Sequence, residues 1–188
     1  MALNNIILGE YISQSDVRNA DNIYGVKDVK GIATSKAFIA TKANLHGVSL
    51  ASYKVVAPSQ FAYVPDTSRR GDKISLGYND SNDTYLVSSI SVVFGVRAEK
   101  ENELLPEYLF LYFCRPEFDR YSRFHSWGSA RETFSWEEMC KIKISLPPID
   151  IQRKYVAVFK ALLANNNGFD IRSICPVLIR GAIEEGGR

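Results

Sequence analysis

Histidine and cysteine, the side chains that most often bind transition metals or act as nucleophiles, are scarce in this sequence. Its 188 residues include two histidines, His46 and His125, and three widely separated cysteines, Cys114, Cys140 and Cys175. No H-E-x-x-H, C-x-x-C or G-x-x-x-x-G-K-[ST] motif occurs. The cysteines are therefore expected to be reduced and mostly buried thiols. These absences argue against nucleotide hydrolysis and against metallohydrolase chemistry.

Long apolar runs are also missing. No stretch approaches the ~20 apolar residues of a membrane-spanning helix, and residues 1–11 lack the basic start and apolar core of a signal peptide. We therefore expect a cytoplasmic protein that does not enter a membrane. With 46% hydrophobic and 23% charged residues, the chain has the composition of a folded globular protein. Its length suits one main domain with an appendage, or at most two small domains.

A large excess of positive charge is absent as well, because the net charge is only +2. Binding to a polyanion would therefore depend on local clusters. One cluster comprises Arg69, Arg70 and Lys73. The other is spread along an aromatic segment and comprises Arg115, Arg120, Arg123 and Arg131. The alternative for each cluster is a solvated face with ordinary ion pairs.

The residue pattern predicts a mixed α/β (α+β) fold with an irregular sheet and packed helices. Stretches at 53–58, 60–64, 73–78 and 85–96 are β-branched and aromatic, and turn residues separate them. We expect these stretches to be successive strands of one sheet, after an extended, loop-rich N-terminal third. Pro106 suits the first turn of a core helix that carries Tyr108, Phe110, Tyr112 and Phe113.

The remaining sequence predicts a short helix, a strand and a helical C-terminal segment. Ser135 and Glu138 have the spacing of a capping box, and Pro147 and Pro148 end the strand that follows. We divide the chain into a domain at 1–148 and a helical, coiled-coil-type segment at 149–188. The helices of this segment carry apolar stripes at Ile151, Tyr155, Phe159, Leu162, Ile174, Leu178 and Ile183. They would form a hairpin with each other or dock on another copy or another subunit.

Several stretches together resemble one known family. The most specific are FAYVP (61–65), LLPEYLFLYF (104–113), the small-residue stretch at 127–131, and the terminal strand with Leu-Pro-Pro and IQRKYV (151–156). From about Leu8 to Asn165 the sequence is similar, in the same order, to the target recognition domain and following conserved helix of a type I restriction-modification specificity subunit.

The resemblance implies a non-catalytic subunit that reads one half of a bipartite site in double-stranded DNA, in the major groove. Its helices would hold methyltransferase (modification) subunits and, through them, restriction subunits. The methyl donor and ATP would be bound by those partners, so no cofactor is expected in this chain.

The sequence departs from the family pattern in two respects. It has one recognition domain, and Asn165 to Gly168 interrupt the helix that usually continues into a long coiled coil. Either the chain is half of a larger subunit, or it is a half-length subunit that pairs with itself or with another chain. A two-fold pairing would present two identical recognition domains to a DNA site whose sequence is an interrupted palindrome. We predict self-association through the region after Pro148.

The aromatic and basic segment is the predicted DNA-contacting part. An arginine fork can grip a phosphate or the edge of guanine, and small residues let the backbone approach a phosphate. Trp127 would line the DNA or brace its loop, whereas Trp136 and Phe118 are expected to be structural. The candidate contacts are Arg69, Arg70, Lys73, Arg120, Arg123, His125, Trp127, Ser129 and Arg131.

An alternative function is a small metal-dependent nuclease in which Pro65-Asp66 begins the metal site. That chemistry needs a second carboxylate and a lysine, and no acid-x-Lys pair follows at the end of a convincing strand. Ser129 and His125 also do not make a hydrolytic triad by spacing alone. We therefore predict a DNA-reading subunit with no catalytic or metal-binding residues.

Overall fold

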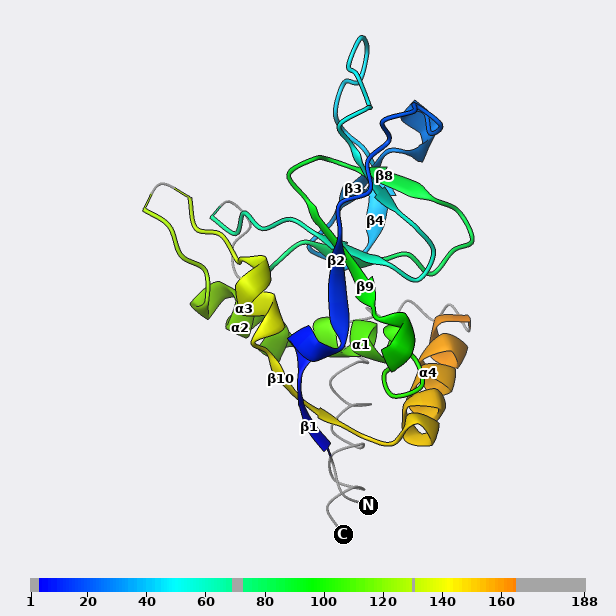
Figure 1. Ribbon diagram of the computed structural model, residues 1–188, viewed down its shortest axis with the longest axis vertical. Coiled ribbons are helices and arrows are strands. Elements are labelled where there is room, and N and C mark those ends of the chain that lie inside the picture. The colour runs from blue at the N-terminus through cyan, green and yellow to red at the C-terminus, as the bar shows by residue number, and fades with distance from the viewer. Residues whose placement is uncertain (1–3, 69–72, 130, 165–188) are drawn as a thin grey trace.

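The computed structural model describes residues 4–68, 73–129 and 131–164 and has the predicted mixed α/β architecture (Figure 1). The strands are β1 (Asn4–Ile7), β2 (Ile12–Ser15), β3 (Lys30–Ile32), β4 (Phe38–Ala40), β5 (Lys54–Val56), β6 (Phe61–Tyr63), β7 (Leu76–Tyr78), β8 (Tyr85–Val87), β9 (Val92–Val96) and β10 (Lys143–Leu146). The α-helices are α1 (Pro106–Phe113), α2 (Pro116–Phe124), α3 (Trp136–Cys140) and α4 (Ile149–Ala164). Three 3-10 turns are η1 (Leu8–Glu10), η2 (Val26–Asp28) and η3 (Ala98–Lys100).

The central sheet is antiparallel and has the strand order β2-β9-β6-β7. Phe61 and Phe94 lie opposite each other on β6 and β9, and their rings stack with centroids 5.0 Å apart. Phe113 of α1 meets both rings edge-on, at 5.6 and 5.9 Å. Aromatic pairs of these geometries add to the free energy of apolar burial. Phe113 of α1 is therefore part of the core, as predicted.

The expectation of one continuous sheet is wrong. The stretch 85–96 forms two strands separated by a turn, in which the Ser91 N–H donates to the Ser88 carbonyl at 2.9 Å. Its first half, β8, pairs with β5, and its second half, β9, joins the central sheet. β3 pairs with β4, and β1 with β10, in two further ribbons. Because the strands are short and tight turns join them, the chain changes direction often. The strands therefore form several small sheets.

Helix α2 was not predicted as a separate element. Pro116 occupies its first turn, and Phe118 is buried against Phe113 with ring centroids 4.7 Å apart. Part of the aromatic segment that looked like a loop is therefore a helix packed on the core. The predicted cap at Ser135 is confirmed, since its hydroxyl accepts a hydrogen bond from the Glu138 N–H at 3.3 Å. Trp136 then packs on Phe94 at 5.5 Å, which confirms its structural role.

Helix α4 packs on α1 and has the predicted bounds up to Ala164. Phe159 is buried, and its ring lies 6.4 Å from that of Phe110. The fully buried Gln152 amide accepts from the Leu105 N–H at 3.0 Å and donates to the Glu103 carbonyl at 2.7 Å. Ile151, Tyr155 and Leu162 are half-buried. The predicted stripe therefore faces the chain's own core in part, and Ile174, Leu178 and Ile183 lie outside the described residues.

Cys114 is buried and Cys140 is half-buried, whereas Cys175 lies outside the described residues. Among the described helices, none combines the length and the apolar character that crossing a membrane requires.

Candidate functional site

Two loops that are far apart in the sequence lie side by side next to α2. The Thr67 N–H donates to the Glu132 carbonyl at 3.0 Å, and the Phe134 N–H donates to the Pro65 carbonyl at 2.9 Å. In Figure 1 both loops extend to the left of the domain, beyond α2 and α3. We call residues 65–68, 73, 120–129 and 131–133 the loop surface. Lys73, the described member of the first basic cluster, thus lies near α2, because the N–H of the adjacent Ile74 donates to Asp119 of that helix.

The segment 127–133 is a narrow hairpin. Trp127 and Thr133 exchange two backbone hydrogen bonds, of 3.1 and 3.0 Å. Gly128 has φ +140°, and a Cβ added there would stand 2.1 Å from the Arg131 carbonyl oxygen. Only glycine fits this backbone without a shift. The hairpin therefore has a defined shape rather than that of an open loop.

The indole of Trp127 projects from this hairpin. The residue is 64% exposed, and Phe124, at the end of α2, is 75% exposed. This exposure suits the DNA-lining role considered for Trp127, which stays a prediction beside the alternative of bracing its loop. Exposed apolar side chains that form a contiguous patch often mark contact surfaces, whereas single ones are common on protein surfaces.

Acidic side chains form pairs with several basic residues of the loop surface. Arg123 forms an ion pair with Glu132, and Arg120 lies 3.4 Å from Glu117. His125 stacks on Tyr121 with ring centroids 4.2 Å apart and directs Nδ1 to Glu138 at 3.3 Å. The ion pairs orient these side chains, yet exposed pairs of this kind contribute at most about 1 kcal/mol. An incoming anion can therefore replace the carboxylates.

Glu138 is shared between Lys141 and His125. It accepts a hydrogen bond from the Lys141 ammonium at 2.7 Å, which holds the pKa of this carboxyl below its usual value, and the nearby His125 adds to the effect. The carboxylate stays charged at neutral pH and keeps the histidine ring in place.

Most of the predicted contact residues lie on or beside the loop surface. Exposed on or beside the loop surface are Lys73, Arg120, Arg123, Trp127, Ser129 and Arg131. His125 is half-buried, and Arg69 and Arg70 lie outside the described residues. Ser129 is on the exposed hairpin, whereas His125 pairs with Glu138, so the structure does not join them as nucleophile and base.

A buried ion pair that the sequence did not reveal positions α2. Lys36 Nζ lies 2.5 Å from Asp119 Oδ1 and 2.9 Å from the Ile74 carbonyl oxygen. Asp119 also accepts from the Ile74 N–H at 3.2 Å. The pair ties α2, which carries Arg120 and Arg123, to the β3–β4 hairpin and to the strand that follows Lys73. A separation of 83 residues leaves no local sequence signal for it.

Asp66, the proposed start of a nuclease metal site, is part of a turn. Its Oδ1 accepts from the Ser68 N–H at 3.0 Å and from the Ser68 hydroxyl at 2.6 Å. Such turns are a common structural use of aspartate. In the described part of the chain, no three His, Cys, Asp or Glu side chains are grouped so that they could hold a metal ion.

Solved structures with TM-scores above 0.5 share this fold. The HsdS subunit from Thermoanaerobacter tengcongensis matches with a TM-score of 0.58 and 18% identity, over 87% of this chain and 43% of that one. A chain from a study of complex assembly and conformational transition of the type I R-M system matches with a TM-score of 0.51 and 12% identity, over 97% and 42%. The type I restriction-modification S subunit from M. genitalium matches with a TM-score of 0.49 and 10% identity, over 87% and 41%. The chain thus spans about two-fifths of the length of these subunits.

Sequence comparison gives a family as well. No curated protein matches the chain. Residues 67–169, more than half of the sequence, match the family described as "Type I restriction modification DNA specificity domain". This stretch includes Lys73, α2, the 127–133 hairpin and α4. By this match the chain belongs to the family of type I restriction-modification DNA specificity domains.

Proposed function

We propose that this chain is the DNA-reading part of a type I restriction-modification specificity subunit and has no catalytic activity of its own. In this proposal the domain at 1–148 reads one half of a bipartite DNA site in the cytoplasm, and the segment at 149–188 contacts other subunits. The observation that carries the proposal is the backbone pairing of 65–67 with 132–134, which supports a shared DNA-contacting surface beside α2 with its exposed arginines and the exposed Trp127.

The chemistry of the loop surface suits the DNA duplex. Exposed arginines neutralise phosphates and release counterions, which supplies much of the affinity of protein–DNA complexes. We infer that Lys73, Arg120, Arg123 and Arg131 make mainly phosphate contacts, and that a minority of contacts reach base edges. The flat, exposed Trp127 would lie against sugars or bases near the point where the hairpin meets the groove.

The outer face of α4 is the proposed subunit contact. Its exposed apolar residues are Ala157, Val158 and Ala161, whereas Phe159 points into the core. Methyltransferase subunits, and restriction subunits through them, are the proposed partners, and pairing with a second copy is the alternative. If a second copy pairs through this face, light scattering over a concentration series will show dimers that Val158→Glu abolishes. A monomer at every concentration, unchanged by this substitution, would leave docking on a methyltransferase subunit.

The DNA-reading function is tested by mapping methylated bases in genomic DNA from cells with and without the gene. The proposal predicts that one bipartite motif loses its methylation when the gene is deleted. Unchanged methylation would contradict it. Magnesium-dependent cleavage of DNA by the purified chain, abolished by Asp66→Ala, would instead support the nuclease alternative.

A further inference from the structure

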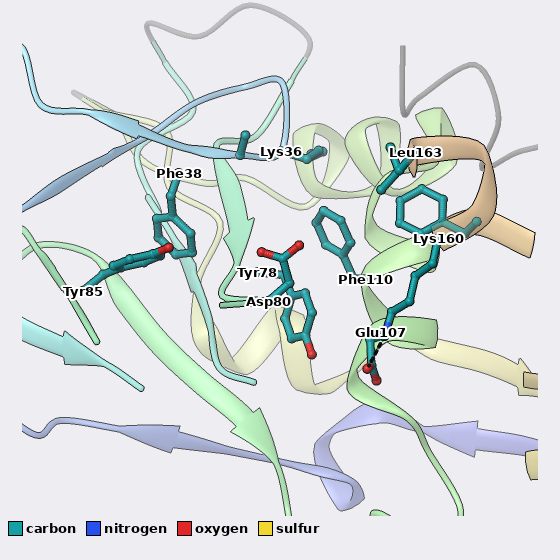
Figure 2. Close-up of a pocket in the computed structure, with 11 residues that line it drawn as sticks. Lys36, Phe38, Tyr78, Asp80, Tyr85, Glu107, Phe110, Lys160 and Leu163 are labelled. Carbon is teal, nitrogen blue, oxygen red and sulfur yellow. Dashed lines mark hydrogen bonds and ion pairs between the residues drawn. The ribbon is translucent and has the colours of Figure 1, made fainter. Parts of the chain in front are cut away.

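A cavity of about 220 Å³ lies between the sheet region and α4, away from the loop surface (Figure 2). Phe38, Tyr78, Tyr85 and Phe110 form most of its walls, and Lys160 and Leu163 bring the end of α4 to its rim. In Figure 1 the end of α4 and the loop surface are on opposite sides of the domain. An occupant of this cavity could therefore bind while the loop surface contacts DNA.

Aromatic rings line much of the cavity, and the charged lining residues are Lys36, Asp80, Glu107 and Lys160, of which Lys36 pairs with Asp119 outside the lining. The rings of Phe38 and Tyr85 meet edge-on at 5.3 Å, and those of Tyr78 and Phe110 lie 5.5 Å apart at 31°. Burial raises the pKa of Tyr78 to about 12, so its hydroxyl stays neutral at physiological pH. The faces of such rings carry partial negative charge and attract cations.

Two carboxylates lie at the mouth of the cavity, and only one of them is neutralised. Glu107 pairs with Lys160 at 3.1 Å. Asp80 is exposed and forms no ion pair with any of the residues that the structure describes. Figure 2 shows its carboxylate directed into the space between Phe38 and Phe110. The cavity therefore combines aromatic faces with one uncompensated negative charge.

Size and charge limit what can occupy this site. Small-molecule sites usually have about 300–1,000 Å³, so a cavity of about 220 Å³ suits a single long side chain better than a cofactor. The carboxylates disfavour a DNA phosphate. A guanidinium can stack on aromatic faces and donate two parallel hydrogen bonds to a carboxylate, which an ammonium cannot do.

We propose that this cavity docks a basic side chain, an arginine, from a partner protein, with Asp80 as its counter-ion and the rings of Phe38, Tyr85 and Phe110 around it. The proposal uses no residue of the loop surface. It can therefore fail without affecting the proposed DNA-reading function.

The test is an NMR titration of the full chain with N-acetyl-arginine methylamide. Signals of Phe38, Asp80 and Tyr85 should shift and saturate with a Kd of about 1 mM, near −4 kcal/mol. The neutral isostere N-acetyl-citrulline methylamide should bind at least about tenfold more weakly. Asp80→Asn should produce a loss of the same size. Asp83→Asn, which removes an exposed carboxylate from the same turn outside the cavity lining, should leave the affinity unchanged.

Three results would overturn the proposal. The first is the absence of saturable shifts at about ten times the expected Kd, and the second is equal binding of the citrulline probe. The third is a change of the cavity signals with protein concentration in the absence of the probe, because it would identify a second copy of this chain as the occupant.

Discussion

The side chain of Lys36 is fully buried, and its ion pair with Asp119 ties α2 to the β3–β4 hairpin. Lys36 has φ +65°, a backbone conformation that is uncommon for lysine, and contacts Asp119 and the Ile74 carbonyl. Taking both charges out of water costs free energy, which the short contact and the extra hydrogen bonds offset. Such a pair contributes little net stability, yet breaking it leaves a buried charge without its counter-ion.

We therefore predict that Lys36→Met lowers the free energy of unfolding by about 3–5 kcal/mol. Lys36→Met combined with Asp119→Leu should recover most of this loss, because no uncompensated charge remains. Urea unfolding of the two single variants and the double variant forms a double-mutant cycle that measures the coupling. A loss of less than about 1 kcal/mol in Lys36→Met would mean that Asp119 does not depend on this lysine.

Single residues differ in how far the sequence predicted their roles. Tyr108, Phe110 and Phe113 were predicted as core because their spacing matches a helix, and they are buried. Lys36 and Asp119 gave no signal, since a charged residue is usually exposed and only tertiary packing reveals its partner. Trp127 was left open between two roles, and its exposure of 64% supports the proposed contact with DNA.

At the scale of elements, the 127–133 hairpin depends on one glycine. Gly128→Ala would bring a methyl group against the Arg131 carbonyl and force the hairpin to open. We expect DNA affinity to fall about tenfold, or about 1.4 kcal/mol, with little change in the melting temperature. Fluorescence anisotropy with labelled duplexes measures this effect.

Gly47→Ala is the matched control for this substitution. Gly47 also has a positive φ, of +72°, but a Cβ there meets nothing within 4 Å, and the residue lies outside the loop surface. Its DNA affinity should equal that of the wild type. Equal losses in both variants would show that general backbone strain, and not the shape of the hairpin, accounts for the effect.

Helix α4 has a buried inner face and an exposed outer face. Phe159→Ala should lower the free energy of unfolding by about 3–5 kcal/mol, because it opens a cavity against Phe110. Val158→Ala, on the outer face, should change it by less than about 0.5 kcal/mol. Thermal unfolding of both variants tests this difference. Similar losses would mean that Val158 is also packed inside a stable assembly.

Elements were predicted from the sequence where the pattern is local. The first-turn proline of α1, the cap at Ser135 and the double proline after β10 each have a short-range physical signal, and all three are confirmed. Helix α2 was missed because its aromatic and basic residues also fit an exposed loop. The prediction of one sheet was wrong because the partner of a strand depends on the turns of the chain and not on the composition of the strand.

For the whole molecule, buried tyrosines limit stability at high pH. Burial raises the pKa of Tyr78, Tyr108 and Tyr112 to about 12 in each case, whereas an unfolded tyrosine has a pKa of about 10. The folded state therefore keeps protons that the unfolded state releases. The resulting stability is fully present below about pH 10 and is lost as the pH rises toward 12.

We predict alkaline unfolding in this window, followed by far-UV circular dichroism and by the absorbance of tyrosinate. Ionisation of these tyrosines should accompany the loss of helix signal. Ionisation near pH 10 in a chain that keeps its circular dichroism would show that the three rings are accessible to water.

The central claim is that the loop surface is the DNA-contacting face, and the salt dependence of DNA binding tests it most directly. Each phosphate contact contributes about 0.9 to the slope of log K against log salt concentration. In a variant with alanine at Arg120, Arg123 and Arg131, the magnitude of that slope should fall by about two to three. The control changes Lys143, Arg153 and Lys154, three exposed cations on β10 and α4, and should leave the slope unchanged. An unchanged slope in the first variant, or an equal decrease in the control, would contradict the account.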